Sequence, residues 1–191
     1  MKITKEWLES KNACHSSLTY VCANNYIGLD IVDFLEKLIK EKRLSDANWL
    51  ITKGMNKKQN VLYAIFAAEQ VISIYEKKYP KDSRPRKAIE AAKRYIKNPC
   101  KKTKAAAYAA YAAATTDAAD AADAAYAADA AANAAYAAAY AADAAYAGYA
   151  GDAGDAAANA GYAGDAAYAG YAGDVIRIKI LNCGIELIKA F

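Results

Sequence analysis

The chain has 191 residues, of which 56% are hydrophobic, and a formal net charge of +4. This length suits one or two domains. The charge is divided unevenly: residues 1–104 contain 22 Lys and Arg against 11 Asp and Glu, whereas residues 105–191 contain 3 against 10. A basic half beside an acidic half indicates either that the halves face each other or that each half meets its own partner.

Several classes of protein are disfavoured by composition. No run of about 18 large apolar residues is present, so we expect no membrane-spanning helix. The first residues, MKITKEWLESK, lack the apolar segment of a signal peptide, so we expect a cytoplasmic protein. The four cysteines show no CxxC spacing and are expected to be free thiols. His15 stands alone and is assigned a structural role, and neither a metal nor a cofactor is expected.

In chain order, the first predicted elements are two short helices over residues 4–11 and 13–24. Trp7 and Leu8 are the expected core anchors of the first helix. Consecutive asparagines at 24 and 25, followed by Gly28, indicate a break after the second helix.

Asp30 is expected to cap an amphipathic helix. The apolar residues of that helix recur at helical spacing, at Ile31, Phe34, Leu35, Leu38 and Ile39. Ser45 is a favourable N-cap for the following helix, which Gly54 would end. Trp49 and Leu50 in that helix should be largely buried.

The longest helix outside the repeat is predicted to begin at Asn56 and to end before Pro80. Its apolar residues trace one face, formed by Val61, Ala64, Ile65, Ala68, Val71, Ile72 and Tyr75. Ser83 and Pro85 then start another helix, since proline is favoured in a first helical turn, and Pro99 ends it.

Residues 104–174 form a repeat in which one Tyr, Asp or Asn follows every two or three small residues. Because alanine is the best helix former, residues 105–147 are expected to be helical, with a turn near 114–117. Seven glycines weaken the helix propensity of the second half, where helix is still favoured over an extended glycine-rich form. Small side chains would let these helices pack closely.

The repeat ends where the pattern changes, so residues 175–191 are expected to form a separate C-terminal helix that packs back on the core. Alternation within VIRIKI suggests a strand, but the spacing of Ile178, Leu181, Ile185 and Ile188 favours a helix. The predicted domains are a basic amphipathic helical domain at 1–103, the repeat helices at 104–174 and this helix. The predicted fold class is all-α.

The block DANWLITKGMNKKQNVLYAIFAAEQVISIYEKKYPKDSRPRKAIEAAKRY, followed by an alanine-rich repeat, resembles the Imm-five-like immunity-protein family. The family pattern has a buried tryptophan, here Trp49, and the motif D-x-RPR-x-AI-x-AA, here Asp82 to Ala92. The resemblance covers residues 45–115 well, and similar proteins are common on bacteriophage genomes. Members commonly carry Arg and His among their alanines, whereas this repeat carries Tyr and Asp. The resemblance implies an inhibitor or immunity role without a catalytic residue.

The sharpest candidate site is a basic cluster formed by Lys77, Lys78, Lys81, Arg84, Arg86 and Lys87. Arg84 and Arg86 flank a helix start, where backbone N–H groups and the helix dipole favour anions. Their planar guanidinium groups also suit carboxylate or phosphate. The alternative is a solvated loop whose arginines pair with Asp82, Glu90 or the Asp residues of the repeat. A second candidate is the repeat itself, in which Tyr126, Tyr136 and Tyr140 would contact a partner or pack internally.

These patterns favour a non-catalytic binding protein of the immunity or phage counter-defence type, which binds and blocks a toxin or a host defence protein. One alternative is a sponge that sequesters a nucleotide-derived immune signal in a basic pocket, and another is a structural alanine-coil module. The expected partner is a protein or a phosphorylated small molecule. Nucleic acid and membrane are not expected, and self-association stays open. Catalysis is disfavoured because the carboxylates are interchangeable repeat units.

Overall fold

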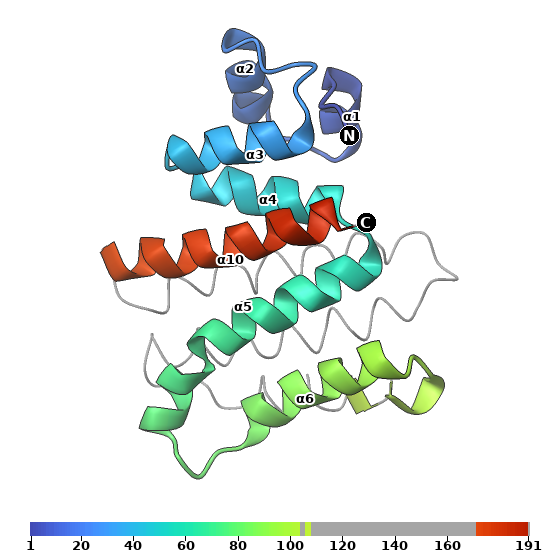
Figure 1. Ribbon diagram of the computed structural model, residues 1–191, viewed down its shortest axis with the longest axis vertical. Helices are drawn as coiled ribbons and strands as arrows, with labels where there is room; N and C mark the ends of the chain where they lie inside the picture. The colour runs from blue at the N-terminus through green and yellow to red at the C-terminus, as the bar shows by residue number, and fades with distance from the viewer. Residues whose placement is uncertain (104–105, 108–170, 191) are drawn as a thin grey trace.

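Helices account for most of the chain that the structure describes, which is residues 1–103, 106–107 and 171–190 of a computed structural model (Figure 1). Within these ranges, the single β-type contact is an isolated bridge between Lys2 and Asp30. The all-α prediction is therefore confirmed. Nearly all of the repeat lies outside the described residues, together with its expected turn near 114–117 and with Tyr126, Tyr136 and Tyr140.

Three short helices form the N-terminal part of the fold. They are α1 (Lys5–Ser10), α2 (His15–Ala23) and α3 (Ile31–Lys40). The Asp30 carboxylate accepts a 2.9 Å hydrogen bond from the backbone N–H of Val32, so the predicted cap of α3 is confirmed. Leu8 is buried in the core, whereas Trp7 is only partly buried against it.

The next helix is α4 (Leu44–Gly54), which begins one residue before Ser45. The prediction that Ser45 is the N-cap of this helix was therefore wrong. Arg43 is the N-cap residue and makes no side-chain cap hydrogen bond. Lys42 has a positive φ of 57°, so the chain turns sharply between α3 and α4. As a result the buried Leu44 is already in the first turn of α4. Burial of this leucine therefore outweighs the capping preference of Ser45.

A helical hairpin follows, formed by α5 (Lys57–Lys78) and α6 (Arg84–Lys97). Asn56 and Gln59 cap the start of α5 reciprocally: the Gln59 N–H donates to Asn56 Oδ1 at 3.0 Å, and the Asn56 N–H donates to Gln59 Oε1 at 2.7 Å. The predicted ends at Pro80 and Pro99 are confirmed, because each proline lies two residues after the last residue of its helix.

The helix α5 is buried on more sides than its sequence pattern indicates. Most of the predicted face is buried, at Val61, Ala64, Ile65, Ala68 and Ile72, while the side chains of Val71 and Tyr75 lie outside the described set. Tyr63, Ala67, Gln59 and Asn60 are buried as well, so a single apolar face was too narrow a prediction. The reason is that α5 packs against both α6 and the C-terminal helix.

That C-terminal helix, α10 (Tyr171–Lys189), lies between α4 and α5 (Figure 1). The prediction of a helix rather than a strand for residues 175–191 is confirmed, although the helix starts four residues earlier than predicted. Gln59 of α5 donates a 2.6 Å hydrogen bond to the Leu187 carbonyl, near the end of α10 where helices leave carbonyls without partners. Arg177 donates to the Ser45 hydroxyl of α4 at 3.1 Å.

The three central helices meet at Gly184, which is buried in α10. A Cβ at this position would lie 2.8 Å from Ile51 Cγ2 in α4 and 2.9 Å from Tyr63 Cε2 in α5. Because glycine has no Cβ, the Tyr63 ring lies against α10, and its hydroxyl donates to Asn48 Oδ1 of α4 at 2.7 Å. Tyr63 therefore links the two helices that α10 separates.

Candidate functional site: the basic α5–α6 hairpin

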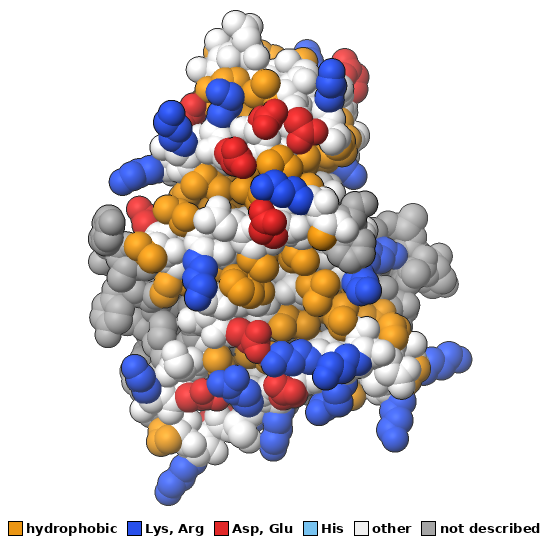
Figure 2. All heavy atoms as spheres, viewed as in Figure 1, with side chains coloured by type: hydrophobic (Ala, Val, Ile, Leu, Met, Phe, Trp, Pro, Cys, Tyr) orange, Lys and Arg blue, Asp and Glu red, His pale blue; other side chains and the backbone are white. Residues whose placement is uncertain are grey.

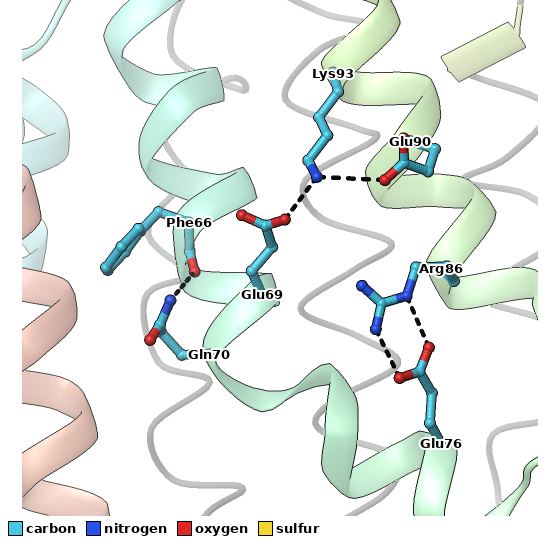
Figure 3. A network of polar contacts seen from close by, with 7 residues as sticks. All are labelled: Phe66, Glu69, Gln70, Glu76, Arg86, Glu90 and Lys93. Carbon is cyan, nitrogen blue, oxygen red and sulfur yellow. Dashed lines mark hydrogen bonds and ion pairs between the residues drawn. The ribbon is translucent and has the colours of Figure 1, made fainter.

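Two ion pairs join α5 to α6 like the rungs of a ladder (Figure 3). Arg86 binds Glu76 with two hydrogen bonds, Nε to Oε1 at 2.7 Å and Nη2 to Oε2 at 2.6 Å. Lys93 Nζ lies 2.7 Å from Glu69 Oε1 and 3.3 Å from Glu90 Oε1. The glutamates are seven residues apart in α5, and their partners are seven apart in α6, so the spacing matches across the hairpin.

The ladder shifts the pKa of Glu76, Arg86 and Lys93 in the direction that keeps these three side chains charged. The hydrogen bonds from Arg86 lower the pKa of Glu76, and the hydrogen bond to Glu69 raises the pKa of Lys93. These side chains are between 35% and 41% exposed, so each rung contributes on the order of 0.5–1 kcal/mol. The ladder thus fixes the register of the hairpin more than it stabilises the fold.

The structure places both arginines of the predicted basic cluster in ion pairs. Arg84 donates to the Asp82 carboxylate from Nε at 3.0 Å and from Nη2 at 2.7 Å. Asp82 also accepts the backbone N–H of Arg84 at 2.9 Å, so the chain's own carboxylate occupies the anion position at the start of α6. Asp82 was among the partners anticipated for these arginines, whereas Glu76, the partner of Arg86, was not.

The lysines of the predicted cluster have a different placement. Lys81 is exposed in the α5–α6 loop and, with Arg84, borders a wide-open recess of about 630 Å³. Lys87 is exposed in the first half of α6. Lys78 is the last residue of α5, and its side chain lies outside the described set.

Further basic residues extend this surface beyond the predicted cluster. Arg94 and Lys97 are exposed in α6, and Arg94 is seven residues after Lys87, which is two helical turns. Figure 2 shows Lys and Arg side chains gathered at the end of the molecule formed by α6 and the α5–α6 loop. Sequence reasoning missed Arg94 and Lys97, although the seven-residue spacing of Arg94 from Lys87 was a usable signal.

A second group of aromatic and charged side chains lies across α2, α3 and α4. The hydroxyls of Tyr20 and Tyr26 both donate to the Glu41 carboxylate, which lowers the pKa of Glu41, while burial raises the pKa of Tyr20. Arg43 lies 3.6 Å from the Tyr20 ring centre and 2.5 Å from Asp46. The adjacent cavity of about 20 Å³ has room for roughly one water molecule.

All four cysteines are free thiols, as predicted. Cys14 is the N-cap residue of α2, and hydrogen bonds with Ser16 and Ser17 lower its pKa to about 7. His15 is exposed at the start of the same helix. Over 1–103, 106–107 and 171–190, no three His, Cys, Asp or Glu side chains gather as metal ligands would. Among the same residues, no helix has both the length and the apolar character needed to span a bilayer.

Comparison with known proteins identifies one family. The model of the family described as Imm-5 like putative immunity protein matches residues 50–163. The matched range begins in α4, contains both helices of the ladder and extends into the repeat. No curated protein and no solved structure matches the chain. Because the match covers more than half of the 191 residues, the chain belongs to the Imm-5 like immunity protein family.

Proposed function

We propose that the protein is a non-catalytic binding protein that neutralises a protein toxin by occupying its surface. The observation that carries this proposal is the family match over residues 50–163, since immunity proteins typically act by binding rather than by catalysis. In a phage counter-defence setting, the target would be a host defence protein instead, with the same mode of action.

The hairpin geometry supports a docking role. Binding costs less when the contacting side chains are already held in place. The ladder fixes α6 against α5, and α5 is itself buried between α6 and α10. An exposed face of α6 therefore rests on a rigid base, as a preformed docking surface requires.

The two alternatives gain less from the structure. A sponge for a phosphorylated signal needs free arginine forks, but Arg84 is engaged with Asp82 and Arg86 with Glu76. A structural alanine-coil module depends on the repeat, nearly all of which lies outside the described residues. Toxin neutralisation is therefore the function that we put forward.

Growth rescue tests this proposal. The full-length chain would be co-expressed with each member of a panel of bacterial toxins and phage-defence effectors that stop growth. We expect rescue from at least one of them, a purified complex of defined stoichiometry by calorimetry, and a toxin whose mass is unchanged in that complex. Rescue accompanied by cleavage or covalent modification of the toxin would overturn the proposal, and so would rescue without a detectable complex.

A further inference from the structure

The basic residues of α6 fall into two groups, those that form ion pairs with α5 and those that are exposed. It contains two pairs of adjacent basic residues, Arg86 with Lys87 and Lys93 with Arg94. The first member of each pair binds a glutamate of α5, at 2.6 Å for Arg86 and 2.7 Å for Lys93. Because an α-helix turns by about 100° per residue, the second member projects about a quarter turn round the helix from the first. Lys87 and Arg94 are accordingly exposed.

Charge is strongly unbalanced around this helix. Residues 76–103 contain 11 Lys and Arg against 3 Asp and Glu. Each of the three carboxylates already accepts a bond from a cation: Glu76 from Arg86, Asp82 from Arg84 and Glu90 from Lys93. In the described part of the chain, no carboxylate lies within 4 Å of seven exposed cations, namely Lys77, Lys81, Lys87, Arg94, Lys97, Lys101 and Lys102.

Three of these cations form an outer stripe along α6, consisting of Lys87, Arg94 and Lys97. At 1.5 Å per residue, Lys87 and Arg94 are about 10 Å apart along the helix, close to the distance over which physiological salt screens charge. Salt therefore screens most of their mutual repulsion, and each cation stays able to attract a partner that carries carboxylates, most strongly at low salt. We infer that the outer stripe is a docking surface for an acidic protein surface. This inference rests on the proposed function, because it takes the occupant to be the neutralised toxin.

The contacts favour carboxylates on a protein over phosphate. Specific phosphate recognition commonly uses arginine forks and helix N-termini. Here Asp82 occupies both the Arg84 fork and the backbone N–H at the start of α6, and Glu76 occupies the Arg86 fork. Six of these seven exposed cations are lysines, which act as flexible point charges and can follow carboxylates spaced over a protein surface.

The aromatic group on α2 to α4 is the competing surface, and its charges are satisfied internally. Glu41 accepts from two tyrosine hydroxyls, and Arg43 pairs with Asp46. An incoming partner would have to break these contacts before it gained new ones. Among the residues that the structure describes, the outer stripe has no ion pair to break, so it offers the larger net gain from charge complementarity.

A binding experiment with probes of defined charge tests the inference. The probes are a fluorescent 12-residue peptide of Asp and Glu separated by Ser, and a duplex DNA of equal charge, titrated into the full-length chain at low salt. The stripe variant is Lys87→Glu, Arg94→Glu and Lys97→Glu. The control variant makes the same charge change elsewhere, with Lys40→Glu, Lys42→Glu and Lys179→Glu, all of which are exposed in the structure.

We expect the stripe variant to bind the acidic peptide at least tenfold more weakly than the control variant does, with a steep salt dependence in the wild type. Equal weakening by the two variants would overturn the inference, because only total charge would then matter. Tighter binding of the DNA than of the peptide at the same stripe would also overturn it, in favour of nucleic acid.

The growth-rescue assay separates this inference from the proposed function. With a toxin that the wild type neutralises, we expect the stripe variant to lose rescue and the control variant to keep it. Rescue by both variants would refute the stripe while leaving the function intact. If no toxin is neutralised at all, the function fails, and the peptide titration still decides whether the stripe binds an acidic surface.

Discussion

At the scale of single residues, Gly184 controls how closely α10 approaches its neighbours. Gly184→Ala gains about 1 kcal/mol of helix propensity. The new Cβ would lie within 2.9 Å of Ile51 and Tyr63, both fully buried, and overpacking of this kind costs about 1–3 kcal/mol. Displacing the Tyr63 ring would also strain its bond to Asn48, worth about 1 kcal/mol.

We therefore expect Gly184→Ala to lower the free energy of unfolding by about 1–3 kcal/mol in urea denaturation, since the packing costs exceed the gain in propensity. Asn182→Ala is the matched control, because Asn182 is exposed in the same helix and the substitution raises propensity without a clash. Equal stability of the two variants would contradict this prediction, because it would mean that the Ile51 and Tyr63 side chains move to accommodate the new Cβ without a cost in stability.

Cys14 provides a second residue-scale prediction, which concerns reactivity. Hydrogen bonds with Ser16 and Ser17 lower its thiol pKa to about 7, so about half of the thiol is ionised at neutral pH. We expect Cys14 to react with iodoacetamide at pH 7 faster than the half-buried Cys183, whose pKa burial raises. Ser16→Ala with Ser17→Ala should shift the pH profile of Cys14 alkylation upwards, as peptide mass spectrometry would show. An unchanged profile would contradict this cause.

At the scale of elements, local signals located helix ends well wherever backbone chemistry decides them. Asp30, Pro80 and Pro99 act through capping or through a missing N–H, and these predictions were confirmed. Ser45 failed because capping preference is worth about 1 kcal/mol, and burial of Leu44 is worth more. A local pattern shows what a residue prefers but not what it is buried against.

The ladder illustrates the same limit at the candidate site. The seven-residue spacing of Glu69 with Glu76, and of Arg86 with Lys93, is visible in the sequence. Whether the two pairs meet depends on the register that the loop between α5 and α6 imposes, which no local pattern encodes. Sequence reasoning therefore found a basic cluster but could not separate its paired arginines from the exposed cations of the outer stripe.

The pairing of Glu76 with Arg86 gives the hairpin a defined pH dependence. The folded-state pKa of Glu76 is lowered by Arg86, so this contribution to stability is fully present above the ordinary glutamate pKa of about 4.5. It is lost as the pH falls through the lower, folded-state value. A double-mutant cycle with Glu76→Gln and Arg86→Gln should give a coupling of about 0.5–1 kcal/mol at pH 7.

The same cycle, repeated below pH 4 by urea denaturation, should give a smaller coupling, and high salt should also reduce it. Glu186→Gln serves as a control, because Glu186 is 71% exposed and its ion pair with Lys189 lies along its own helix. A coupling that persisted undiminished in acid would mean that the Glu76–Arg86 contact is not the ion pair the structure shows.

At the scale of the whole molecule, the order of helices in space differs from their order in the chain. Consecutive elements usually pack side by side, so α4 and α5 would be expected to touch along their length. Instead α10 lies between them, after the chain has passed through the entire repeat (Figure 1). No local pattern marks this insertion, because it arises from the fit of Gly184 against Ile51 and Tyr63. The predicted domain at 1–103 therefore has a core that residues 171–190 help to build.

This shared core predicts that damage to α10 will spread to the N-terminal helices. Leu181 is 2% exposed, and Leu181→Ala should cost about 2–5 kcal/mol through lost burial and the cavity that remains. In native-state hydrogen exchange, we expect protection to fall together in α4, α5 and α10, because the three helices unfold as one cooperative unit. Val175→Ala, at a residue that is 51% exposed in the same helix, should leave all three unchanged. If protection fell in α10 alone, α4 and α5 would hold together without it, and the repeat would connect two separately stable parts.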